Sequence, residues 1–309
     1  MRVALDAVAE NAPPESVVQS AIAALAAVRE LRLVLVGEPT RLNQALAAAD
    51  KKVLERITLH PASQAIAADE DPEEALRFRP DTSVGRSWQL LAERKVEAML
   101  SLAPLRALTA AGMRLRRFLP TVRRPALAAV LVAAGQRTVV LDAGAHDTAS
   151  PAHLYQYGVM GSVYCRLLDS CETPRVSLLA EGNPSDLREA DRLLEAGLPG
   201  QTYAGLVRPR QALEGATDVL VCSGAAGRTL VATQQRLAAL LHEADLPAVA
   251  VQDPKPLLGF SGYVLWLPSL EALEEALALA QRLEAVRFNE ELRQQLQHGP
   301  LMGAAGEEG

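Results

Sequence analysis

Short apolar segments alternate with amphipathic ones at the start of the chain, and this alternation constrains the fold more than any other feature. Strands are expected at Val3–Asp6, Leu31–Gly37 and Arg56–His60. Between the first two of these, Val18 and Ile22 recur at helical spacing. Strands that alternate with helices in this way pair in parallel and are covered by helices. The sequence therefore predicts an α/β fold with a mostly parallel sheet.

The same alternation continues along the chain. Further strands are expected at Val96–Leu100, Arg175–Leu179, Tyr203–Val207, Asp218–Cys222 and Gly262–Leu267. Ala126–Val132 and Arg137–Leu141 flank a short turn and are expected to form a hairpin. Helices are expected at Asp81–Arg94, Leu105–Leu119, Ser185–Ala196 and Leu270–Gln297. Pro61–Pro80 is acidic and lacks periodicity, so we expect a solvated loop with at most one helical turn.

Composition excludes several classes of protein. With 309 residues and 49% hydrophobic content, the chain can bury a large core, and we expect a single domain over 1–298 and a flexible tail at 299–309. The net charge of -6 argues against nucleic-acid binding. No apolar run reaches the ~18 residues of a transmembrane helix, and no signal peptide is expected. Cys165, Cys171 and Cys222 lack metal-ligand spacing, so we expect reduced thiols, no metal site and a cytoplasmic protein.

The most distinctive stretch is YQYGVMGSVY, which spans Tyr155–Tyr164. Within it, Tyr157, Met160, Gly161 and Tyr164 recur at i, i+3, i+4 and i+7. One interpretation is a core or dimer-contact helix, in which glycine allows close backbone approach. The alternative is a helix that follows a turn binding phosphate or a carbonyl group, and the preceding VVLDAGAH segment would then supply that turn.

Two other segments invite a binding hypothesis. A basic run on the expected helix at Leu105–Leu119 includes Arg106, Arg114, Arg116 and Arg117. Such a run suits anionic lipid or an acidic carrier protein, although it is also typical of a solvated helix face. The other segment, Ser223–Arg228, is a glycine-bearing turn between a strand and a helix, where backbone N–H groups can meet a phosphate. Ser223 itself is more typical of a helix cap than of a nucleophile, because no elbow motif surrounds it.

Several of these segments, taken in order, resemble the PlsX family of phosphate acyltransferases. They are MRVALDAV, RRPALAAV, VVLDAGAH, HLYQYGVMGSVY, VLVCSGAAGRTL and KPLLGFSGYVLW. The resemblance implies an α/β/α sandwich like that of isocitrate and isopropylmalate dehydrogenases, assembled as a homodimer. It also implies a reaction of acylated acyl carrier protein with inorganic phosphate, without a cofactor. The product, acyl phosphate, would enter phospholipid synthesis.

The resemblance also suggests site residues. It points to Asp142, His146 and Ser223 as catalytic candidates, with His146 standing where the family has Asn. Candidates for binding phosphate or the acyl group are Asn11, Gly144, Gly182, Arg210, Gly224, Gly227 and Arg228. Tyr157, Met160, Gly161 and Tyr164 would form the core or dimer helix.

The chain departs from the family pattern at its polar turns. Val8–Pro14 lacks two family glycines, and Ser101–Ala107 is largely apolar where the family loop is small and polar. Ala180–Ala190 lacks two family lysines, while Ser223 and Arg228 replace Asp and Asn. The segment between Gly227 and Pro256 is also short, which argues against the membrane-surface contact linked to the family's helical arm. Two hypotheses follow: a divergent acyltransferase, or a catalytically silent relative that acts as a binding or regulatory partner.

Overall fold

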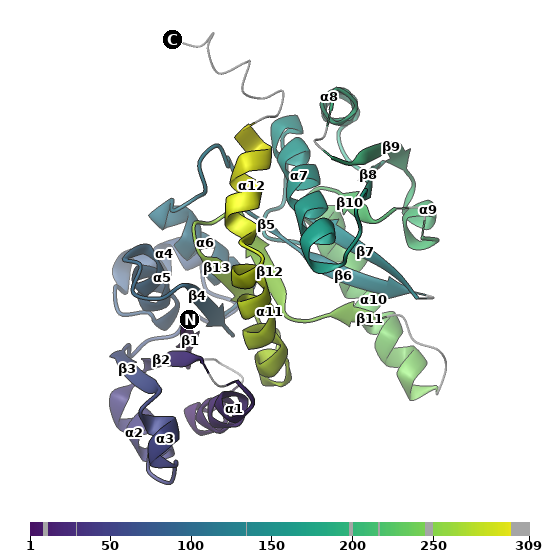
Figure 1. The fold of residues 1–309 in the computed structure, drawn as a ribbon. Helices are drawn as coiled ribbons and strands as arrows, with labels where there is room; N and C mark the ends of the chain where they lie inside the picture. Colours follow the sequence, from purple (N-terminus) through teal and green to yellow (C-terminus); the bar gives the residue numbers. More distant parts are fainter. Residues whose placement is uncertain are drawn as a thin grey trace. The chain divides into compact units, whose positions relative to one another are not determined.

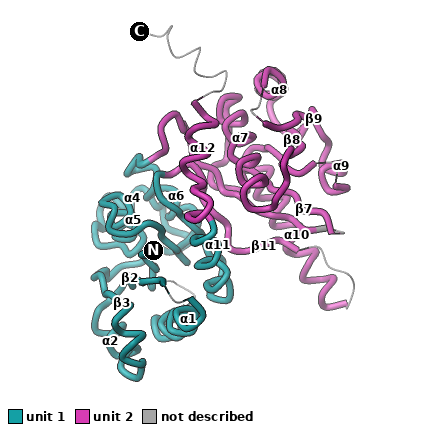
Figure 2. The backbone as a smooth tube through the Cα atoms, viewed as in Figure 1, with its two compact units in different colours: residues 1–117, 261–282 teal, residues 118–260, 283–309 magenta. Residues whose placement is uncertain are grey.

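The chain divides into two compact units in the computed structural model (Figure 2). The structure describes residues 1–8, 12–28, 30–133, 135–197, 200–215, 217–244 and 250–297. Unit 1 comprises residues 1–117 and 261–282, and unit 2 comprises residues 118–260 and 283–309. The sequence predicted one domain over 1–298, whereas each of these units is compact by itself and is built from two separate stretches of the chain. The expected tail at 299–309 lies outside the described residues.

Unit 1 contains a parallel sheet whose strands run in the order β3-β2-β1-β4-β13 (Figure 1). The strands are β1 (Arg2–Asp6), β2 (Arg32–Gly37), β3 (Ile57–Pro61), β4 (Ala98–Ser101) and β13 (Tyr263–Trp266). The helices are α1 (Pro14–Ala27), α2 (Pro39–Leu46), α3 (Lys51–Leu54), α4 (Pro72–Phe78), α5 (Ser83–Ala92) and α6 (Leu105–Leu115). The expected parallel pairing of the first three strands is thus confirmed.

Unit 2 contains a mixed sheet in the order β11-β6-β7-β10-β8-β9. The strands of unit 2 are β5 (Ala126–Leu127), β6 (Ala129–Ala133), β7 (Gln136–Leu141), β8 (Arg175–Leu179), β9 (Thr202–Val207), β10 (Val219–Val221), β11 (Ala250–Gln252) and β12 (Lys255–Leu258). Neighbours among β7, β10, β8 and β9 are parallel. Strand β6 is antiparallel to both β7 and β11, so the predicted hairpin is confirmed. Strand β5 pairs with β12.

The remaining helices follow the predicted pattern less closely. They are α7 (Pro151–Leu168), α8 (Pro184–Glu195), α9 (Pro209–Leu213), α10 (Gly224–Glu243), α11 (Leu273–Ala285) and α12 (Phe288–Gln297). The single long helix expected at Leu270–Gln297 is wrong, because Arg287 adopts a left-handed φ of 51° between α11 and α12. The expected loop at Pro61–Pro80 contains α4, which begins where the Asp71 side chain accepts a hydrogen bond from the Glu74 N–H. The α6 helix ends at Leu115 because Arg116 adopts a φ of 49°.

Helix α7 carries the distinctive YQYGVMGSVY stretch and packs on β7 and β10, next to α12 (Figure 1). The side chains of Tyr157 and Met160 are fully buried. Tyr164 is 5% exposed and meets the Phe288 ring edge-on, with 6.3 Å between centroids. A Cβ atom added to Gly161 would lie 2.4 Å from Val219 Cγ1 and 2.8 Å from Leu141 Cδ1. These residues are therefore part of the core of unit 2, and they leave no surface of their own for a second subunit.

We predict that Gly161→Ala destabilises the protein although alanine favours helices. The added methyl group must displace Val219 and Leu141, and such overpacking costs about 1–3 kcal/mol. Replacing Val219 with alanine removes the atom nearest to the new Cβ. The double variant Gly161→Ala/Val219→Ala should therefore lose less stability than the sum of the losses measured for the two single variants. Urea unfolding of the four proteins measures this coupling. Additive losses would show that α7 does not rest on β10 at this point.

Candidate functional site

Three parallel strands of unit 2 end together at one edge of the sheet. Leu141 of β7 lies beside Val221 of β10, and Val221 lies beside Leu178 of β8. The loops at 142–149, 180–183 and 222–223 follow these ends. In open α/β sheets, ligands bind outside the carboxyl ends of the strands, so this edge is the candidate active site.

Asp142 organises the first of these loops. Its carboxylate is fully buried and accepts four backbone N–H bonds, of 2.9–3.1 Å, from Leu127, Gly144, Ala145 and His146. Burial raises the pKa of this carboxyl, and the four N–H donors oppose that rise. Because both oxygens are engaged, Asp142 is suited to holding the loop rather than to accepting a proton from a substrate.

The first turn of α10 lies directly against that loop. A Cβ added to Gly224 would lie 1.8 Å from the His146 carbonyl oxygen and 2.7 Å from Asp142 Oδ2. A Cβ added to Gly227 would lie 1.9 Å from the Asp142 carbonyl oxygen. No side chain fits at either position. The two glycines therefore allow the helix to pack against the loop, a role different from the phosphate binding suggested by the sequence.

The donors at the start of α10 are largely engaged within the protein. Ser223 caps the helix by accepting a hydrogen bond from Ala226, and the Ala225 N–H donates to the Asp147 carbonyl at 3.2 Å. Arg228 forms a 2.5 Å ion pair with Asp147, and its side chain packs over Gly144, which has a φ of 124°. Ser223 is thus a cap residue, and Arg228 stabilises the neighbouring loop.

His146 presents an unusual imidazole at this edge. Its Nε2 atom is buried and has no hydrogen-bond partner among the described residues. The nearby Pro125 carbonyl oxygen favours a protonated ring nitrogen, which we assign to Nδ1 because Nε2 has no partner among the described residues. Burial, followed by the positive charge of Arg124, lowers the pKa of His146 to about 4. The ring is therefore neutral at pH 7, and the Nε2 lone pair is available as an acceptor.

Arg124 was not among the candidates from the sequence, because its segment RRPAL read as part of a basic run. Its Nη1 atom donates to the Thr148 carbonyl at 3.0 Å, which places the guanidinium next to the loop that Asp142 holds. Guanidinium groups have five N–H donors and bind phosphate well. The structure therefore adds Arg124 to the candidate residues, as a cation at this edge of the sheet.

A pocket of about 160 Å³ lies where the three loops meet. Its apolar lining includes Leu154, Leu178, Leu179, Leu187 and Cys222. Ser223 and Gly182 also line it, together with the carboxylates of Asp147, Glu181 and Asp186. Among the described residues, no lysine or arginine lines the pocket, so it repels an anion unless Arg124 or Arg228 neutralises these acids.

One of the remaining candidates lies away from this pocket. Arg210 pairs with Glu214 on the exposed side of α9, at 2.8 Å, and does not line this pocket. Asn11 lies outside the described residues.

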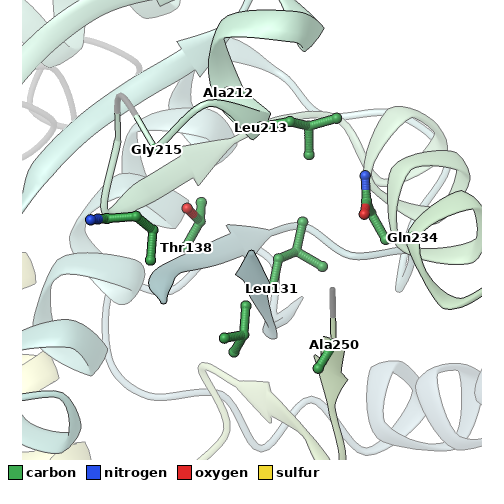
Figure 3. A pocket seen from close by; sticks show the side chains of 9 residues that line it. Leu131, Thr138, Ala212, Leu213, Gly215, Gln234 and Ala250 are labelled. Carbon is green, nitrogen blue, oxygen red and sulfur yellow. The ribbon is translucent and has the colours of Figure 1, made fainter. Parts of the chain in front are cut away.

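A second hollow, of about 20 Å³, lies at the opposite end of β7, between Thr138, Leu131 and Gln234 (Figure 3). It contains no candidate residue and has room for little more than a water molecule.

Unit 1 has its own buried carboxyl group at a strand end, which sequence reasoning missed. Asp6 accepts a 2.9 Å hydrogen bond from Ser101 Oγ, and Ser101 Oγ accepts one from the Ala103 N–H at 3.1 Å. Burial raises the pKa of Asp6 to about 6. The only sequence signal was an acidic residue at the end of a buried strand. Asp6 and Ser101 together hold the loop that follows β4.

The described ranges contain neither a group of metal ligands nor a membrane-spanning helix. Within them, no three His, Cys, Asp or Glu side chains are grouped so that they could hold a metal ion. Each helix in the same ranges is too short or too polar to cross a membrane.

We predict that Gly224→Ala strongly destabilises unit 2. The new methyl group would overlap the His146 carbonyl, so either α10 or the loop must move, at a cost of about 3 kcal/mol or more. Ala225→Ser is the matched control, because Ala225 is exposed at the next position and its backbone bond to Asp147 is retained. Chemical denaturation measures both variants. Equal stability of Gly224→Ala and the wild type would contradict the close packing.

Comparisons with known proteins identify the family of the chain and agree with its fold. A family model described as "Fatty acid synthesis protein" matches residues 1–244. A phosphate acyltransferase of Pseudomonas fluorescens is 34% identical over 285 residues, which are 90% of this chain and 83% of that protein. A phosphate acyltransferase of Alkalilimnicola ehrlichii is 34% identical over 245 residues, which are 77% of this chain and 71% of that protein.

Solved structures with low sequence identity share the fold. A phosphotransacetylase from Streptococcus pyogenes superposes with a TM-score of 0.68 at 15% identity, covering 92% of this chain and 94% of that one. A branched-chain phosphotransacylase from Enterococcus faecalis has a TM-score of 0.60 at 15% identity, covering 91% of this chain and 98% of that one. These structures support the α/β fold, and the sequence relatives define the family. The chain therefore belongs to the PlsX family of phosphate acyltransferases.

Proposed function

We propose that the protein transfers an acyl group from acylated acyl carrier protein to inorganic phosphate and releases acyl phosphate. The observation that carries the proposal is the 34% identity to a phosphate acyltransferase over 90% of the chain. The neutral His146 next to Arg124, at the carboxyl ends of the unit 2 strands, supports it. We place the activity in the cytoplasm, at a step that feeds phospholipid synthesis.

The reaction requires a nucleophile, a base and a proton donor. A phosphate oxygen attacks the thioester carbonyl, the new C–O bond forms, and the C–S bond breaks. The phosphate proton is removed during the attack, and the departing thiolate of the carrier takes up a proton. A single group with a pKa that allows both transfers can perform them in turn.

We assign this role to His146. Its Nε2 lone pair has no partner among the described residues, so it would accept the phosphate proton once a movement of the loop exposes this buried atom to the substrate. A hydrogen bond from Nδ1 to the Pro125 carbonyl would hold the ring in the tautomer that this step needs. The pKa of about 4 makes the imidazolium a strong acid, which suits the return of the proton to the thiolate, and it makes the ring a weak base in the first transfer.

Asp142 and Arg124 would support this step in different ways. The Asp142 carboxylate accepts the His146 N–H at 2.9 Å and thereby positions the residue without touching the substrate. Arg124 has N–H donors besides the one that binds Thr148, and these would bind the phosphate oxygens. Its charge would offset the carboxylates of the neighbouring pocket.

The assembly we propose is a homodimer formed through the C-terminal half of α10. Beyond Gln234, none of the residues of this helix is buried, and Leu237 and Leu240 are 39% and 45% exposed. A second copy would cover these leucines. Light scattering should give twice the mass of one chain for the wild type and a single-chain mass for Leu237→Asp/Leu240→Asp; a wild-type monomer would contradict the assignment.

The reaction itself is tested with acylated acyl carrier protein and labelled phosphate. We expect acyl phosphate from the wild type and about a hundredfold lower kcat from His146→Gln, because general bases contribute about 10²–10⁴-fold. His60→Gln is the matched control, on the edge strand β3 of unit 1. No product above the enzyme-free rate would overturn the proposal and favour a catalytically silent relative.

The pH dependence follows from the lowered pKa. His146 gains its proton only near pH 4, so the base form predominates above about pH 5. After correction for phosphate ionisation, kcat/KM should be level between about pH 5.5 and 8. Arg124→Gln removes the charge that lowers the pKa and should move the acid limb upward. An acid limb near the ordinary histidine value in the wild type would contradict the role of Nε2.

A further inference from the structure

Unit 1 has a larger pocket than unit 2 at the equivalent edge of its own sheet. The pocket measures about 330 Å³ and lies at the carboxyl ends of β4 and β13, which are parallel neighbours. Its size is at the lower end of the range typical of small-ligand sites, about 300–1,000 Å³. Its walls include Leu102, Ala103, Pro104, Trp266, Leu267 and Leu270.

Hydrogen bonds within the chain hold the walls in place. Trp266 Nε1 donates to the Ala103 carbonyl at 3.0 Å, and the Ala103 N–H donates to Ser101 Oγ at 3.1 Å. Ser101 Oγ in turn donates to the buried Asp6 carboxylate at 2.9 Å. Both backbone polar groups of Ala103 are therefore engaged. The indole ring and the loop after β4 form a pocket that needs no rearrangement to admit a ligand.

The chemistry of the walls does not favour a bound anion. Pro104 and Pro268 have no backbone N–H, and the Ala103 N–H is already bonded to Ser101. Among the described residues of the lining, the one charged side chain is the carboxylate of Glu271. The other walls are aliphatic or aromatic except for Ser269. The apolar part of this surface suits a hydrocarbon chain better than phosphate.

We propose that this pocket binds the hydrocarbon chain of a fatty acyl group. The identity of the chain rests on the proposed acyl transfer, whereas the preference for an apolar chain rests on the walls alone. Leu102 and Pro104 occupy the loop that reads SLAPLRA in this chain, and this apolar loop forms one wall of the pocket. Changes at Leu102 should therefore alter acyl-chain binding.

Trp266 is a built-in reporter for this proposal. The protein has two tryptophans, and Trp88 is fully buried, away from the pocket lining, whereas Trp266 forms one of the walls. A fatty acid brominated in mid-chain, added below its micelle concentration, quenches tryptophan emission only on contact. We expect saturable quenching that an unbrominated fatty acid reverses.

Two variants place a charge in the pocket, and one places the same charge elsewhere. Leu102→Asp and Ala68→Asp should each raise the apparent Kd of the brominated acid at least tenfold, because the chain would then meet a carboxylate. Ala68 is exposed at the rim, so this variant keeps the fold even if Leu102→Asp does not. Ala48→Asp is the matched control, exposed in unit 1 and outside the pocket lining, and should leave the Kd unchanged.

Unsaturable quenching, or equal quenching of all these proteins, would overturn the pocket assignment. Acyl phosphate formation, measured on the same samples, separates this outcome from failure of the proposed function. If acyl phosphate forms but quenching does not depend on the pocket variants, the proposed function is retained and the chain-binding site is rejected. If quenching depends on the pocket variants but no acyl phosphate forms, the apolar site is supported and the acyl transfer is rejected.

Discussion

The contact between the first turn of α10 and the loop after β7 determines the geometry of the candidate active site. Gly224 and Gly227 allow the two backbones to approach to a distance at which no side chain fits. On the other side, the Asp142 carboxylate binds four N–H groups of the same region. Held from both sides, the loop presents His146 with Nε2 unpaired. The chemistry that we propose depends on this packing.

Much of the fold could be predicted from local sequence pattern. Hydrophobic periodicity located the parallel strands of unit 1 and the β6–β7 hairpin, because strands and helices impose different spacings on apolar residues. The break at Arg287 could not be predicted, since arginine carries no turn signal. The division into two units was also missed, because each unit is assembled from stretches far apart in the sequence.

The candidate site was predicted in part. The sequence identified the two loops that meet at the unit 2 edge, at Asp142–His146 and at Ser223–Arg228. The sequence predicted phosphate binding for Gly224, whereas this glycine allows close packing of two backbones. The two roles cannot be told apart in a sequence, because each requires a residue without a side chain. It also missed Asp6, whose partner Ser101 lies 95 positions away, and no local pattern reports such a contact.

The direct test of the account is ¹⁵N NMR of the histidine rings, of which the protein has five. At pH 7, His146 should show a protonated Nδ1 and an unprotonated Nε2, and inorganic phosphate should shift the Nε2 resonance in a saturable manner. Arg124→Gln should weaken that shift, since it removes the proposed phosphate ligand. A His146 ring that titrates at the ordinary histidine pKa, or that does not respond to phosphate, would contradict the account.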